Sequence, residues 1–115
     1  MARILGVVSD LMLASRVEGS LRAAGHEVQI EPSLPEPVEA DVIVCDLDVA
    51  DPEAVVATGL PALGFYAHTD VETRSRAEAA GLQPVVPRSR MARDLVNLVD
   101  GLLGPDAGDV AGEPG

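Results

Sequence analysis

The sequence contains no lysine, because its eight basic residues are all arginines. This absence excludes chemistry that needs a lysine amine, such as a Schiff base or a phosphate-loop lysine. Nineteen acidic residues give a net charge of -11, which disfavours binding to nucleic acid or to an anionic membrane. The only aromatic residues are Phe65 and Tyr66, so no series of rings is available to stack on nucleic-acid bases.

Cysteine and long hydrophobic runs are also scarce. The single cysteine, Cys45, cannot form an intrachain disulfide, and its apolar neighbours favour a small buried side chain. The longest apolar runs, such as residues 4–8, are far shorter than the roughly 20 residues that cross a bilayer, and we find no signal-like segment. A chain of 115 residues with 47% hydrophobic residues can build one core. We therefore expect a single cytoplasmic domain.

The sequence alternates between short apolar runs and amphipathic segments. The apolar runs predict strands at 3–8, 26–30, 41–45, 61–66 and 84–86. Helices are expected between Ser9 or Asp10 and Gly25, from Pro52 onward, from a Thr69/Glu72 capping box to Ala80, and after Ser89 up to residue 103.

Three prolines interrupt residues 31–40, where a helix would be expected in this alternation. Proline lacks a backbone N–H and restricts the residue before it, so this helix should be short or missing. The predicted fold is a flavodoxin-like three-layer α/β sandwich with a five-stranded parallel sheet of order 2-1-3-4-5. It occupies residues 1–103, and residues 104–115 should form a disordered acidic tail.

Acidic residues follow two of the predicted strands. In this strand order, ligands bind beyond the carboxyl ends of the first and third strands, which carry Asp10 and Asp46. Carboxylates that converge there favour a hard cation such as Mg2+, and one of them could accept a phosphoryl group. The alternative is that both residues are helix caps or loop acids.

Several motifs carry a resemblance to a known family. Val-Val-Ser9-Asp10 looks like the end of a first strand, and Val-Ile-Val-Cys45-Asp46 looks like a third strand that ends in an acceptor. Pro61-Ala-Leu-Gly-Phe-Tyr66-Ala67 is similar to the fourth strand. In these motifs, across residues 3–103, the chain resembles the receiver domains of bacterial two-component signalling.

The resemblance implies that Asp46 is the phosphoacceptor, Asp10 a metal ligand and Asp48 the donor of a backbone carbonyl to the metal. Three pocket positions depart from the family pattern. At two of them, Ser9 replaces an acid and Tyr66 replaces a small hydroxyl residue, and the third is the position of the family's lysine. The family's lysine corresponds to Arg88 in an ungapped alignment, or to Pro87 with a one-residue gap. The fifth strand also lacks the usual aromatic residue.

Three functions are compatible with this pattern. The first is a divergent or pseudo-receiver that is not an enzyme and acts through protein interaction without phosphorylation. The second is an atypical receiver in which Asp46 accepts phosphate with Mg2+, and Arg88 replaces the lysine. The third is a flavodoxin-like small-molecule-binding protein or enzyme, with His68 as a candidate acid or base.

Receivers commonly dimerise or dock through their fourth helix, fifth strand and fifth helix. The corresponding region here is rich in arginine, with Arg74, Arg76, Arg90 and Arg93. Against an acidic remainder, this favours a basic face for a protein partner or a second copy. The alternative is an ordinary solvated face with local ion pairs to Glu72, Glu78 and Asp94.

Overall fold

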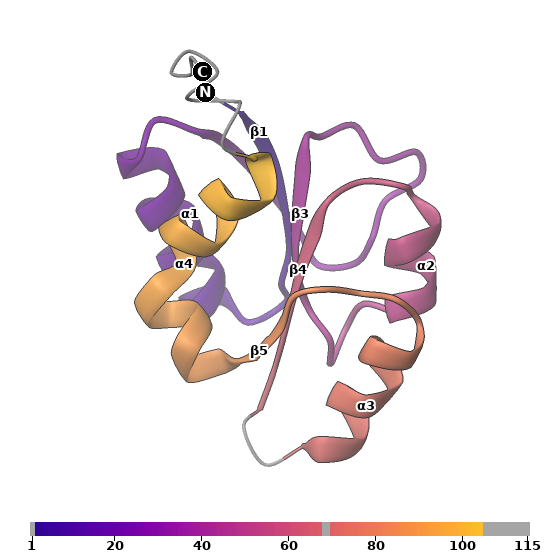
Figure 1. Ribbon diagram of the computed structural model, residues 1–115. Helices are drawn as coiled ribbons and strands as arrows, with labels where there is room; N and C mark the ends of the chain where they lie inside the picture. The colour runs from indigo at the N-terminus through magenta and orange to yellow at the C-terminus, as the bar shows by residue number, and fades with distance from the viewer. Residues whose placement is uncertain (1, 68–69, 105–115) are drawn as a thin grey trace, which may run out of the picture.

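The computed structural model describes residues 2–67 and 70–104. Figure 1 shows a central sheet between two helical layers. In chain order the elements are β1 (Arg3–Val7), α1 (Leu11–Ala23), β2 (Glu27–Glu31), β3 (Val42–Asp46), α2 (Pro52–Ala57), β4 (Ala62–Tyr66), α3 (Val71–Ala79), β5 (Val85–Pro87) and α4 (Arg88–Leu103).

The five strands form one parallel sheet in the order β2-β1-β3-β4-β5, which confirms the predicted flavodoxin-like topology. Helices α1 and α4 cover one face of the sheet, and α2 and α3 cover the other (Figure 1). Residues 32–41, between β2 and β3, contain no helix, as the three prolines predicted. The second crossover is therefore an irregular segment with bends rather than a helix.

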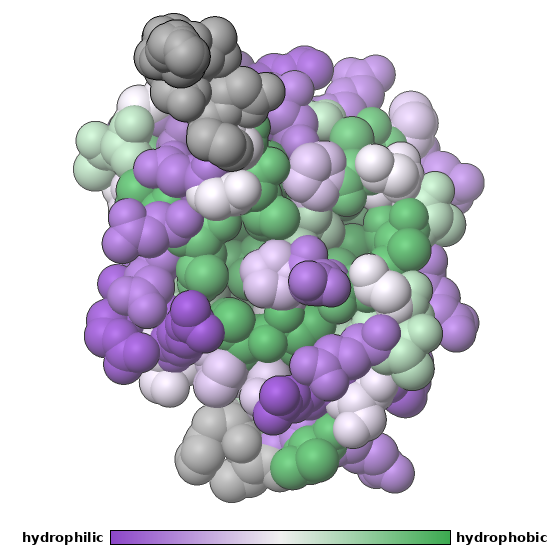
Figure 2. Space-filling model, viewed as in Figure 1, coloured by the Kyte–Doolittle hydropathy of each residue, from purple (hydrophilic) through white to green (hydrophobic). Residues whose placement is uncertain are grey.

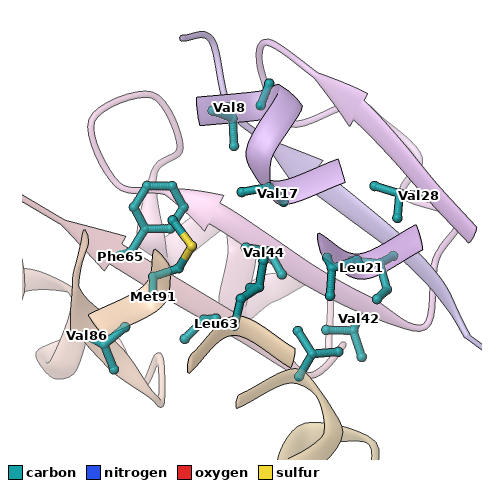
Figure 3. Packing of buried hydrophobic residues seen from close by; sticks show 14 residues of the cluster. Val8, Val17, Leu21, Val28, Val42, Val44, Leu63, Phe65, Val86 and Met91 are labelled. Carbon is teal, nitrogen blue, oxygen red and sulfur yellow. The ribbon is translucent and has the colours of Figure 1, made fainter. Parts of the chain in front are cut away.

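Two hydrophobic layers flank the sheet because successive strand residues point to opposite faces. The α1/α4 layer, part of which is shown in Figure 3, has at its centre Val17, Leu21, Val44, Leu63, Phe65 and Met91. The α2/α3 layer includes Leu5, Ile43, Cys45, Val55, Tyr66 and Leu82. Cys45 is fully buried in this layer, and burial raises the pKa of its thiol to about 12. This agrees with its expected role as a small hydrophobe.

The boundaries differ from the sequence-based predictions by a residue or two. The second, third and fifth strands each lie one residue later, so that Asp46 and Pro87 are strand residues. The predicted capping box was wrong, because α3 begins after Asp70, whose carboxylate accepts hydrogen bonds from the N–H and hydroxyl of Thr73. His68, Thr69 and the tail from residue 105 lie outside the described residues.

The surface in Figure 2 shows the side of the molecule that carries the edge strand β5. Hydrophobic residues lie along the middle of this view, and hydrophilic residues are most frequent around its margin, where apolar residues also reach the surface. Within residues 2–67 and 70–104, no helix is long and apolar enough to cross a membrane.

Candidate functional site

Asp46 is the last residue of β3, and every residue of this strand is buried. Its Cα pairs with that of Phe65 on β4, and the alternation of side chains directs it to the α1/α4 side of the sheet, together with Val42 and Val44. Its side chain is only 5% exposed. It is the one buried polar or charged residue in the described part of the chain, which makes it the centre of the candidate site.

Both carboxylate oxygens of Asp46 have a neighbour. Oδ1 accepts a hydrogen bond of 2.9 Å from the backbone N–H of Asp48, and Oδ2 lies 3.7 Å from Nη2 of Arg88. Burial raises the pKa of Asp46 above its ordinary value, and the charges of Asp48 and Asp10 act in the same direction. The Asp48 hydrogen bond and the Arg88 charge oppose this rise without cancelling it.

Asp10 lies near Asp46, and its carboxylate also caps the N-terminus of α1. Its Oδ1 accepts hydrogen bonds from the N–H groups of Met12 and Leu13, at 2.9 and 3.0 Å, so Asp10 is the N-cap of α1. The preceding Ser9 is exposed. Asp10 and Asp46, with the Asp48 carbonyl, are the groups that could hold Mg2+ here. Among residues 2–67 and 70–104, no cluster of three or more His, Cys, Asp or Glu side chains could hold a metal.

Tyr66 lies on the other side of the sheet from Asp46. It follows Phe65 on β4, and its side chain packs in the α2/α3 layer, with 5% of the residue exposed. The ring is therefore not among the side chains around Asp46, although the sequence comparison grouped Tyr66 with the pocket. Ala67, the next residue, does line a cleft with Arg88.

The structure distinguishes between the two alignments of the family's lysine. Pro87 ends β5, whereas Arg88 opens α4 and directs its guanidinium to Asp46. The Nε atom of Arg88 is shielded from solvent and has no hydrogen-bond partner among the described residues. Arg88 is thus the cation beside Asp46.

An open cleft of about 400 Å3 lies beside this pair, between α1 and the start of α4. Its lining residues are Leu13, Arg16, Ala67, Arg88, Ser89 and Ala92. Sequence reasoning missed Arg16, because nothing in its local pattern marks it. The available signal was its helical spacing from Leu13, which places both residues on one side of α1.

The four arginines predicted to form an interaction face each have a carboxylate within 4 Å. The pairs are Arg74–Glu78 at 3.2 Å, Arg76–Asp51 at 3.5 Å, Arg90–Asp94 at 3.6 Å and Arg93–Asp94 at 3.8 Å. The hydrogen bond and charge of Glu78 also raise the pKa of Arg74. Exposed pairs of this kind add little stability. Local pairing, one of the two interpretations of this region, is therefore present in the isolated chain.

The topology and the position of Asp46 define a flavodoxin-like α/β protein with an acidic residue at the carboxyl edge of its central strand. No family model matches the sequence, and no curated protein is significantly similar to it. Solved structures nevertheless show the same fold, which is that of response-regulator receiver domains.

A putative response regulator from Chloroflexus aurantiacus has 24% identity and a TM-score of 0.76, with 89% of this chain and 97% of that one covered. The non-phosphorylated HemR receiver domain from Leptospira biflexa has 21% identity and a TM-score of 0.74, covering 90% and 95%. A chemotaxis response regulator of Vibrio cholerae has 20% identity and a TM-score of 0.73, covering 89% and 98%. The chain therefore has the receiver fold.

Proposed function

We propose that this protein is a cytoplasmic, non-enzymatic signalling module with a receiver fold, which acts by binding another protein and does not require phosphorylation. The observation that supports this proposal is the state of Asp46. Its side chain is buried, one oxygen is hydrogen-bonded to Asp48, and the other faces Arg88. A carboxylate in these contacts must give up one of them before its oxygen can attack phosphorus.

The surroundings of Asp46 support the same conclusion. Ser9 supplies no second acid to hold a metal, and the Tyr66 ring lies in the α2/α3 layer, away from the acceptor. A transferred phosphoryl group would thus have few groups to neutralise or orient it beyond Arg88. The chain thus has the receiver fold but fewer of the side chains that would support phosphoryl transfer.

Intact-mass spectrometry tests the chemical half of the proposal. The protein is incubated with Mg2+ and acetyl phosphate, alongside a receiver domain that is known to be phosphorylated as a control for the reagent. We expect no mass increase on this chain. A stoichiometric gain of one phosphoryl group that disappears in Asp46→Asn would overturn the proposal.

The surface formed by α3, β5 and α4 is our candidate for the binding face. Arg74, Arg90 and Arg93 are exposed there, and their present carboxylate partners are close enough to exchange for those of an acidic protein surface. The partner is a protein with an acidic surface or a second copy of this chain. Sedimentation of the pure protein tests self-association: a wild-type dimer that is lost in an Arg90→Ala/Arg93→Ala double variant would identify the partner as a second copy bound at this face, and a monomer would leave binding to another protein.

A phosphoacceptor receiver is the second candidate, because Asp10, Asp46, Asp48 and Arg88 do converge at one edge of the sheet. In that function Arg88 would neutralise the phosphoryl group in place of lysine. Arg88→Ala should then abolish phosphorylation, whereas Arg90→Ala, which removes an arginine of the same helix that pairs with Asp94, should leave it unchanged.

A further inference from the structure

The cleft between α1 and α4 contains two guanidinium groups that the described residues leave short of partners. Six of the eight arginines form an ion pair with a carboxylate in the described part of the chain, but Arg16 is not among them. Arg16 and Arg88 both line this cleft. Two cations thus face one cleft in a protein of net charge -11.

Arg88 has unused hydrogen-bonding capacity. Its distance of 3.7 Å from Asp46 is longer than a hydrogen bond, so the contact with Asp46 is electrostatic. Its Nε–H is shielded from water and has no acceptor among the described residues. A buried donor without an acceptor costs free energy, so a rotation of the guanidinium that brings Nε–H to an oxygen in the cleft would relieve that cost.

We propose that this cleft binds a small phosphate-type dianion without covalent chemistry, either inorganic phosphate or the phosphate of a small monoester. Planar guanidinium groups match the oxygens of phosphate in paired hydrogen bonds, so Arg16 and Arg88 can hold different oxygens of one anion. The hydroxyl of Ser89 is a third donor in the lining.

The remaining lining residues, Leu13, Ala67 and Ala92, are apolar, and the cleft of about 400 Å3 exceeds what a bare phosphate fills. A monoester with a small apolar group fits such walls. The binding differs from phosphorylation of Asp46, because no bond forms to the carboxylate. Asp46 is instead a competitor, which attracts Arg88 and repels the incoming anion.

The test is an NMR titration of the amide resonances with inorganic phosphate in the presence of a chelator, so that no Mg2+ contributes. We expect saturable shifts at Ser89 and Ala92. Arg16→Ala and Arg88→Ala should each weaken binding about tenfold, since each removes a charge-assisted pair. Arg93→Ala is the matched control, because Arg93 lies on the same helix and pairs with Asp94.

The phosphate affinity of Asp46→Asn distinguishes specific binding in the cleft from a general attraction of phosphate to surface arginines. It should tighten phosphate binding about threefold or more, because a nearby like charge is removed and Arg88 is released. The proposal is overturned if Arg93→Ala weakens binding as much as Arg16→Ala, or if the shifts never saturate. It is also overturned if binding needs Mg2+ and is lost in Asp46→Asn, since the anion would then occupy the acidic edge.

Parallel titrations with phenyl phosphate and with a short acidic peptide identify the source of the anion. Tighter binding of phenyl phosphate indicates a small monoester, and equal binding indicates inorganic phosphate. If the peptide binds most tightly, the cleft is a protein-docking surface and the small-anion proposal fails. These results are independent of the acetyl phosphate experiment, which reports only on the carboxylate of Asp46.

Discussion

The two faces of the sheet are covered very differently. On one face, α1 and α4 have 13 and 16 residues, and they enclose Phe65 and Met91. On the other face, α2 and α3 have only 6 and 9 residues, and the irregular segment 32–41 lies where a helix would complete the layer. Leu34, Val38 and Val49 on that side are only partly buried. The α1/α4 side, which has the longer helices, is also the side on which Asp46 and the α4 residue Arg88 meet.

Replacement of one leucine by alanine on each face tests this difference most strongly. Leu63 is fully buried in the α1/α4 layer, whereas Leu5, which is 3% exposed, borders two shallow surface depressions near Pro35 and Glu39. Leu63→Ala should leave a closed cavity and cost about 4 kcal/mol, against about 2.5 kcal/mol for Leu5→Ala. Urea unfolding measures both values. Equal losses would show that the α2/α3 layer is packed as tightly as its counterpart.

Added methyl groups limit this comparison, because the side chain next to each glycine, rather than the layer as a whole, decides how well the methyl is tolerated. A Cβ on Gly64 would lie 2.7 Å from Cδ2 of Leu82 and 3.2 Å from Leu47, both buried in the α2/α3 layer. A Cβ on Gly6 would meet Cδ1 of Ile30 at 2.8 Å, but this side chain is only half-buried and can turn away. We expect Gly64→Ala to cost about 2 kcal/mol and Gly6→Ala about 1 kcal/mol. Thermal unfolding of the two variants would contradict this if Gly6→Ala were the more damaging.

The charge of Asp46 has a smaller effect on the free energy of unfolding, and this effect depends on pH. Because burial raises the pKa of Asp46, the folded protein binds its proton more tightly than the unfolded chain does. The resulting stability is lost as the pH rises from the ordinary value of 3.8 through the raised folded pKa. Asp46→Asn should remove this loss and stabilise the protein at neutral pH by about 1 kcal/mol.

Denaturant unfolding across that pH range measures the difference between Asp46→Asn and wild type. Asp48→Asn is the matched control, since it removes a neighbouring charge but keeps the backbone N–H that bonds Asp46. A difference that stays flat with pH, or a destabilised Asp46→Asn variant, would show that ionised Asp46 is well accommodated by Arg88.

Much of the fold could be predicted from local sequence. The β-branched runs located the strands, and three prolines identified the missing helix, because both signals depend on the backbone alone. The site could be predicted only in part. Asp46 was found from its place at the end of a strand, but the position of the Tyr66 ring depended on strand register, which a one-residue shift reverses. Arg16 lies far from Arg88 in sequence, and only the packing of α1 beside α4 brings both into one cleft.

An effect of similar small size concerns Asp10, which is both the cap of α1 and a candidate metal ligand. Asp10→Ala should cost about 1 kcal/mol, because the N–H groups of Met12 and Leu13 lose their acceptor. Asp10→Ser keeps a capping oxygen and should restore most of that stability, but it removes the carboxylate that a Mg2+ ion would need.

Unfolding experiments with and without Mg2+ separate the two roles of Asp10. If Mg2+ stabilises wild type and this gain is absent in Asp10→Ser, the carboxylate binds metal as well as capping the helix. If Mg2+ leaves both proteins unchanged, helix capping accounts for Asp10, and the α1/α4 side of the site acts through its arginines alone.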